Sequence, residues 1–162
     1  MKIGVVADTH SHPLPAQMLN DFKKVDLIIH AGDFCTLDVL EELQKIREVK
    51  AVYGNMDGRD IRSLFPRSQI LQMEGVRVGL FHGEGAAPGV LKKVKFEFQG
   101  KPVDAVVFGH SHRPMNELID QVLYFNPGSP NDRVFAPRCS YGILEVRDKD
   151  ITGDVITVKE KF

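Results

Sequence analysis

The sequence has no tryptophan and only two cysteines, Cys35 and Cys139, in 162 residues. Two cysteines cannot build the disulfide framework of a small secreted domain, and their spacing does not match a zinc knuckle. We expect both to be core thiols. No apolar run approaches the ~18 residues of a membrane span, and the stretch before Asp8 is too short for the core of a signal peptide. We therefore predict a soluble cytoplasmic protein that does not bind membranes.

A large net charge is also absent, because 21 basic and 22 acidic residues give a formal charge of -1. Such a chain has no overall field to attract nucleic acid or an anionic membrane. It also lacks a tract of basic and aromatic residues suited to a nucleic-acid strand, so we expect no nucleic-acid partner. No repeat, low-complexity tract or linker interrupts the chain. With 43% hydrophobic residues it can bury one core, so we predict a single domain over residues 1–162.

What the sequence does contain is a series of short apolar runs, each ending in a residue that can bind a metal. The five residues at these ends are Asp8, Asp33, Asn55, His82 and His110. Asp8 and His110 are each followed two positions later by a histidine, His10 and His112. In open α/β sheets, ligands bind beyond the carboxyl ends of the strands. The pattern therefore predicts one shared site.

Apolar runs alternate with helical patterns in the first half of the chain, which favours βαβ crossovers and a largely parallel sheet. The clearest predicted helix covers residues 37–47, with Thr36 as its N-cap. Further helices are predicted at residues 15–24, 90–98 and 60–64.

From residue 69 onward the pattern changes to one typical of hairpins. Residues 70–73 and 76–81 are separated only by Glu74-Gly75. Further strands are predicted at residues 122–125, 141–146 and 155–159, with a turn at 148–150. We expect these later strands to be antiparallel and to form a second sheet stacked on the first.

Each metal-binding candidate alone has a simpler explanation. Asp8 could be a turn or cap residue, His82 a buried imidazole with ordinary partners, and Gly54-Asn55 a turn dipeptide. The pair His110 and His112 is a stronger signal, because residues two apart on extended backbone point the same way.

Together the donors comprise two aspartates, four histidines and one asparagine, more than the three or four protein ligands of one catalytic zinc. Two metal ions fit this set better than one. Ions roughly 3.5 to 4 Å apart need a bridging carboxylate, and we assign Asp33 to that role because it is central in sequence order. Imidazole and carboxylate favour transition metals over magnesium or calcium. We expect Mn²⁺, with Ni²⁺, Co²⁺, Fe²⁺ or Zn²⁺ as alternatives.

The motif order resembles that of the calcineurin-like metallophosphoesterases: Asp-x-His, Gly-Asp, Gly-Asn, His and Gly-His-x-His. Here these motifs are Asp8-Thr9-His10, Gly32-Asp33, Gly54-Asn55, His82 and Gly109-His110-Ser111-His112. The segment Asn126-Pro127-Gly128-Ser129 resembles a loop of the small members, and the chain length is similar to that of the YfcE-like branch of microbial phosphodiesterases. The resemblance implies a four-layer α/β/β/α sandwich of two mixed sheets flanked by helices.

The resemblance also implies a division of the ligands. One metal would be held by Asp8, His10, Asp33 and His112, and the other by Asp33, Asn55, His82 and His110. A hydroxide between the metals would attack phosphorus, so no catalytic side chain beyond the metal-bound hydroxide is implied. The expected activity is metal-dependent hydrolysis of a small phosphodiester, for which a nucleotide-like compound is a candidate.

Two positions depart from the family pattern. Met56 stands where many members have a histidine that protonates the leaving oxygen. General acid catalysis contributes about 10²- to 10⁴-fold, so its loss favours diesters with good leaving groups over monoesters. Glu84 stands where relatives commonly have a histidine, and it is either solvated at the rim or a charge that discourages monoesters.

Three further residues near the motifs are candidates for the rim of the site. His12 could bind substrate phosphate or supply a proton, beside Asn55 as a second substrate-binding residue, or it could be an ordinary loop histidine. Asp57 and Arg59 are rim candidates that a solvated loop would explain equally well.

Other function classes remain to be weighed against hydrolysis. A non-catalytic interaction scaffold is one, because a subunit of the retromer sorting coat has the same fold. That subunit departs from the family pattern at some metal positions, whereas this chain keeps all seven. A single structural zinc is disfavoured by the excess of donors. The sequence does not distinguish a monomer from a homo-oligomer.

Overall fold

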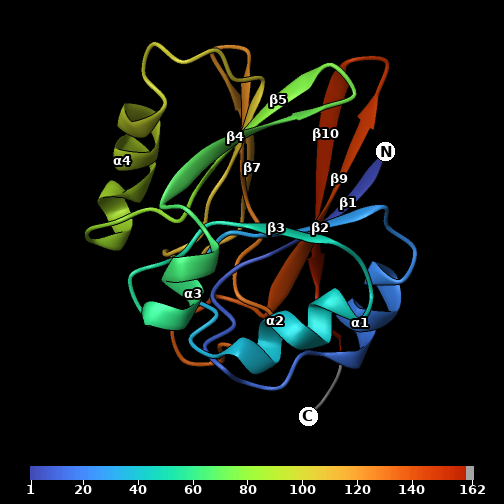
Figure 1. Cartoon of the computed structure of the whole chain (residues 1–162). Helices are drawn as coiled ribbons and strands as arrows, with labels where there is room; N and C mark the ends of the chain where they lie inside the picture. Colours follow the sequence, from blue (N-terminus) through green and yellow to red (C-terminus); the bar gives the residue numbers. More distant parts are fainter. Residues whose placement is uncertain (160–162) are drawn as a thin grey trace.

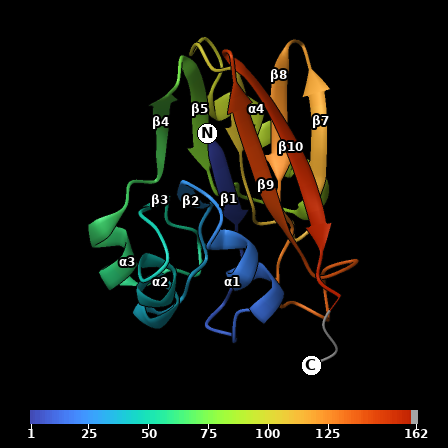
Figure 2. The same ribbon diagram turned by 90° about the vertical axis from the view of Figure 1, so that its right-hand side faces the viewer.

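The computed structural model describes residues 1–159, which form two five-stranded sheets packed face to face (Figures 1 and 2). The strands of the first sheet are β1 Lys2–Val6, β2 Leu27–His30, β3 Val49–Ala51, β9 Ser140–Arg147 and β10 Asp150–Thr157. The strands of the second sheet are β4 Ser68–Met73, β5 Val76–Phe81, β6 Ala105–Val107, β7 Met115–Ile119 and β8 Val122–Asn126. Their spatial orders are β10-β9-β1-β2-β3 and β4-β5-β6-β8-β7.

Helices cover the outer faces of both sheets. They are α1 Ala16–Phe22, α2 Leu37–Gln44, α3 Arg59–Leu64 and α4 Val90–Glu97, the last preceded by a 3-10 turn at Ala87–Gly89. Phe22 and Leu43 from α1 and α2 pack against the outer face of the first sheet, and Val94 from α4 packs against the second. Figure 1 shows α4 on the opposite side of the molecule from β9 and β10. The predicted α/β/β/α sandwich is confirmed. Within residues 1–159, no helix has both the length and the apolar character needed to cross a bilayer.

The central strands read as continuous apolar runs because both of their faces are buried. In β1, Ile3 and Val5 point into the core between the sheets, whereas Val6 belongs to the cluster under α1 and α2. Side chains alternate between the two faces of a strand, so a strand covered on both sides must be apolar at nearly every position. Fully burying each such side chain stabilises the fold by about 1.5–3 kcal/mol.

The predicted parallel first half and the hairpin are both confirmed. β2 lies between β1 and β3 and pairs parallel with each, and β4 pairs antiparallel with β5. The expectation that all later strands are antiparallel was wrong, because β6 pairs parallel with β5 and with β8. A crossover through α4 joins β5 to β6, and such a connection returns the chain in the same direction.

Three further details differ from the sequence prediction. The strands predicted at residues 141–146 and 155–159 were expected in the second sheet, but they are β9 and β10 of the first sheet. β10 begins at Asp150 rather than at residue 155, because the turn from β9 is made by Asp148 and Lys149 alone, both with positive φ. A two-residue turn with two left-handed residues matches the twist of a hairpin. Strand β7 was not predicted, and it forms one edge of the second sheet, opposite β4.

Candidate metal centre

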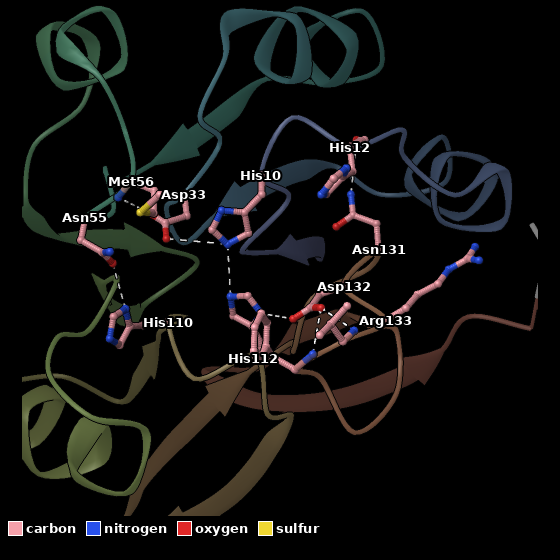
Figure 3. Close-up of a pocket in the computed structure, with 12 residues that line it drawn as sticks. His10, His12, Asp33, Asn55, Met56, His110, His112, Asn131, Asp132 and Arg133 are labelled. Carbon is pink, nitrogen blue, oxygen red and sulfur yellow. Dashed lines mark hydrogen bonds and ion pairs between the residues drawn. The ribbon is translucent and has the colours of Figure 1, made fainter.

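Seven side-chain donors converge at one edge of the two sheets, in the loops that follow β1, β2, β3, β5 and β6. These donors are Asp8, His10, Asp33, Asn55, His82, His110 and His112. Figure 3 shows His10 facing His112 and Asn55 facing His110. A pocket of ≈ 540 Å³ lies over five of the seven, while Asp8 and His82 are buried beneath. All the residues predicted from the strand ends are therefore neighbours.

One group of donors is formed by Asp8, His10 and His112, whose nearest ligand atoms all lie within 4.8 Å of one another. The Nε2 atoms of His10 and His112 are 3.1 Å apart. His112 Nε2 lies 3.4 Å from Asp8 Oδ1, and His10 Nε2 lies 3.8 Å from Asp33 Oδ2. Three donors from two loops thus form one group, and Asp33 from a third loop lies beside it.

A second group lies beside the first. His82 Nε2 is 3.3 Å from Asp33 Oδ2 and 3.1 Å from Asn55 Oδ1. His110 Nδ1 is 2.9 Å from the same Asn55 oxygen. Asp33 Oδ2 therefore lies within 4 Å of a histidine in each group. Asp8 is equally central, because its Oδ1 is 3.4 Å from His112 and 3.8 Å from His82.

Three of the histidines hold one ring nitrogen outward and the other toward this centre. His82 Nδ1 donates to the carbonyl oxygen of Ala31 at 2.8 Å, and His110 Nε2 donates to that of Gly85 at 2.7 Å. His112 Nδ1 contacts the Asp132 carboxylate. A carbonyl oxygen can only accept, so in the neutral rings of His82 and His110 the nitrogen that faces the centre carries a lone pair. Metal-binding histidines show this arrangement, and the donor set fits divalent metal ions.

The backbone at these donors is strained. Asp8, Asp33 and His110 have φ angles of 55°, 60° and 69°, and His10 and His112 are also left-handed. Non-glycine residues in this region cost about 1–3 kcal/mol each and cluster at functional sites. The spacing of His110 and His112 had suggested extended backbone, and this expectation was wrong. They point to different groups, His110 to Asn55 and His82, and His112 to Asp8 and His10.

The Asp57 carboxylate accepts hydrogen bonds from the loops after β2 and β3. Its Oδ2 accepts hydrogen bonds from the backbone N–H of Asp33 at 2.9 Å and of Gly54 at 2.7 Å, and its Oδ1 accepts one from Cys35 at 2.8 Å. Asp57 is only 4% exposed. The interpretation of Asp57 as a rim residue was wrong, since it ties the loop after β2 to the loop after β3.

His30 shows how a histidine at a strand end can serve structure instead. It is fully buried at the end of β2 and stacks on Phe34, with ring centroids 3.5 Å apart. Its Nδ1 accepts the N–H of Gly32, so its Nε2 donates to the Thr9 hydroxyl at 3.1 Å. Burial, together with the neighbouring His82, holds the pKa of His30 well below its ordinary value. His30 is therefore a neutral support for the loop that carries Asp33.

The carboxylates and imidazoles of the centre shift one another's pKa. Burial opposes ionisation of Asp33, but the hydrogen bond and charge of a protonated His82, together with the backbone N–H of Met56, outweigh it and lower the pKa. The pKa of His82 is raised against burial by Asp33 and Asp8. The pKa of His112 is raised to about 9, also against burial, by hydrogen bonds and charges of Asp8 and Asp132. The centre therefore attracts positive charge, whether protons or metal cations.

The loop after β8 closes one side of the centre. The Ser129 hydroxyl donates to the backbone oxygen of Asp8 at 2.8 Å, and the Asn131 amide donates to that of Thr9 at 3.0 Å. Asp132 then contacts His112. Sequence reasoning noted the segment 126–129 but missed Asp132, which no motif indicated.

The rim residues predicted from the sequence lie at different places. Met56 and His12 are exposed and line the pocket, and Figure 3 shows His12 beside Asn131. Glu84 lies on the His82 side, where Arg67 and Lys93 pair with it at 3.2 and 3.9 Å. The charge of Glu84 is therefore partly compensated. Arg59 begins α3 and is not part of the pocket lining.

Comparison with known proteins places this geometry in a family. The model for the calcineurin-like phosphoesterase superfamily domain matches residues 1–149. A probable metallophosphoesterase of Methanothermobacter thermautotrophicus is 37% identical, with 96% of this chain and 92% of that protein covered. The phosphodiesterase YfcE of Escherichia coli is 32% identical over 66% of this chain and 58% of its own length.

Solved structures agree on the fold. A structure described as a novel archaeal phosphodiesterase is 27% identical, with a TM-score of 0.77 over 96% of this chain and 100% of that chain. Vps29 from Entamoeba histolytica, a single mutant, has a TM-score of 0.78 at 20% identity, covering 98% of this chain and all of that chain. At that level of identity the likeness to Vps29 concerns the fold alone.

Proposed function

The chain belongs to the calcineurin-like phosphoesterase superfamily, and from that premise we propose that it is a metal-dependent phosphodiesterase acting on a small phosphodiester. A phosphoesterase that uses divalent metal ions is what the family and its relatives support directly. The proposal adds a preference for diesters, the number of metal ions and the roles of individual residues. The observation that carries it is the convergence of seven donors, with lone-pair nitrogens of His82 and His110 directed inward.

Two metal ions would be held in the two groups of donors already described. Asp8, His10, Asp33 and His112 would hold one, and Asp33, Asn55, His82 and His110 the other. Asp33 is proposed as the shared ligand because its Oδ2 lies 3.8 Å from His10 Nε2 and 3.3 Å from His82 Nε2. When bound, such ions would lower the pKa of a coordinated water to about 7 and stabilise charge on the phosphoryl oxygens. Manganese is the ion we propose.

The side chains around the centre orient the donors and contact the substrate. Ala31, Gly85 and Asp132 keep the inward nitrogens of three histidines in position. The Oδ1 atom of Asn55 faces His82 and His110, so its amide nitrogen is the atom that can donate to a phosphoryl oxygen. His12, on the exposed side of the pocket, is placed to hydrogen-bond another oxygen of the ester.

Met56 supports the choice of a diester with a stabilised leaving group. Its thioether lies on the pocket wall and cannot donate a proton to a departing alkoxide. Without general acid assistance there, hydrolysis depends on the acidity of the leaving alcohol or phenol. A diester also carries one negative charge fewer than a dianionic monoester, which suits a pocket that contains the carboxylates of Asp33 and Asp132.

The test is hydrolysis of bis(p-nitrophenyl) phosphate by protein stripped with a chelator, before and after addition of Mn²⁺. We expect activity only with metal, and its loss in Asp33→Asn. Asp154→Asn, an exposed carboxylate on β10, is the matched control and should retain activity. Faster turnover of p-nitrophenyl phosphate than of the diester would contradict the proposed preference.

A scaffold of the Vps29 type is the alternative. It predicts that the chain binds metal but hydrolyses neither ester with manganese, nickel, cobalt, iron or zinc. The same assay therefore separates the two functions.

A further inference from the structure

We infer that the pocket over the metal centre holds an aromatic ring of the substrate's ester group, against Met56, Val134 and Phe135. The inference rests on the proposed function, because the ring must belong to a molecule whose phosphate reaches the seven donors. The substrates would then be aryl or nucleoside esters of phosphate, selected by these three side chains.

Three exposed apolar side chains line the pocket together with the donors. Within residues 1–159 seven large hydrophobic side chains are exposed, and three of them line this one pocket. Met56 is 60% exposed, Val134 79% and Phe135 78%. Apolar surface gathered beside a polar centre is characteristic of a binding site rather than of scattered surface residues.

The loop that carries Val134 and Phe135 is held in place by a residue of the centre itself. Asp132 Oδ1 accepts the backbone N–H of Val134 at 2.8 Å and that of Phe135 at 3.0 Å. The other oxygen of Asp132 contacts His112. The backbone of the apolar pair is thus fixed relative to the donors, which lowers the entropic cost of binding a ring there.

Size and chemistry favour an aromatic group over phosphate alone. A pocket of ≈ 540 Å³ lies within the range of about 300–1,000 Å³ found for organic ligands, and it is far larger than one phosphoryl group requires. Phenylalanine packs on rings by offset stacking or edge contacts, and the methionine sulfur packs favourably at ring edges. Figure 3 shows the Arg133 side chain extending away from His10 and His112, so it does not cover the donors.

The experiment is isothermal titration of manganese-loaded protein with phenylphosphonate and with methylphosphonate. The two ligands share the phosphonate and differ by the ring. We expect phenylphosphonate to bind about tenfold more tightly, and Phe135→Ala to reduce this ratio to about twofold or less. Phe135→Tyr, which keeps a ring, should retain the preference. Phe96→Ala is the matched control, because Phe96 is 75% exposed on α4, outside the pocket.

Three outcomes would overturn the inference. Equal affinities of the two phosphonates for the wild type would show that no ring is selected. An unchanged ratio in Phe135→Ala would remove Phe135 from the site. Loss of a dimer in Phe135→Ala by sedimentation, with the ratio unchanged, would show that a second copy covers the loop. The ratio is measured without turnover, so failure of the diester assay alone would count against the proposed function and not against this site.

Discussion

Asp132 contacts the ring of His112 with one carboxylate oxygen and shapes the following loop with the other. His112 Nδ1 is held by this contact, so its Nε2 points toward Asp8 and His10. The contact also lowers the pKa of Asp132 against its burial and contributes to the raised pKa of His112. One side chain thereby links a proposed metal ligand to the loop whose Val134 and Phe135 line the pocket.

Asp132→Asn should weaken Mn²⁺ binding about 10- to 100-fold, as changes at such outer partners of ligating histidines typically do. Asparagine has a single acceptor oxygen, which cannot serve both His112 and the two backbone N–H groups in the same way. The measurement is competition of the protein with a chelator for Mn²⁺. Asp154→Asn is the control, and an affinity in Asp132→Asn equal to that of the control would refute the role of Asp132.

Asp57→Asn should destabilise the protein by about 1–3 kcal/mol, because at least one of the backbone N–H groups that it binds would lose its acceptor. The carboxylate accepts three such groups, from Asp33, Gly54 and Cys35. Urea denaturation of the metal-free protein gives the free energy of unfolding. Asp60→Asn, an exposed carboxylate in α3, is the comparison and should have little effect. Equal stability of the two variants would contradict the role assigned to Asp57.

Metal affinity should rise with pH between about 6.5 and 9. The pKa of His112 in the metal-free fold is raised from 6.5 to about 9, so its proton stabilises that fold fully below pH 6.5 and ceases to do so as pH passes 9. A bound metal must displace this proton, and each displaced proton changes the affinity by up to about tenfold per pH unit. Titrations with Mn²⁺ at pH 6.5, 7.5 and 8.5, each in two buffers of different ionisation enthalpy, report proton release. A flat profile without proton release would exclude a protonated His112 in the metal-free state.

Met56→His should restore a proton donor at the pocket wall. We expect at least about a tenfold gain for diesters with alkyl leaving groups and a smaller change for nitrophenyl leaving groups, since acid assistance matters most for poor leaving groups. Comparing kcat/KM for the two classes of diester measures this difference. Met56→Leu is the control for the lost thioether. A uniform gain or loss across leaving groups would show that position 56 affects binding rather than proton transfer.

The strand-end donors could be recognised from the sequence because they depend on local chemistry. Apolar runs such as residues 3–7 mark strands buried on both faces, and the polar residue that ends each run marks where the chain leaves the core. Parallel strands bring such ends to one edge of a sheet, so the neighbourhood of Asp8 and Asp33 follows from order alone. The sandwich architecture followed from the motif order by resemblance and from the change to hairpins after residue 69.

The contacts between residues far apart in the chain were decided only by the tertiary structure. His30 ends a strand like the other candidates, yet it bonds Thr9 and Gly32 and lies outside the centre. Asp57 and Asp132 reach their partners across 24 and 20 positions, and no periodicity encodes such a pairing. The direction of β6 depends on the crossover through α4, and the position of Phe135 in the pocket lining depends on how its loop packs. Local patterns record whether a side chain is buried, whereas the partner it meets is set by the packing of distant segments.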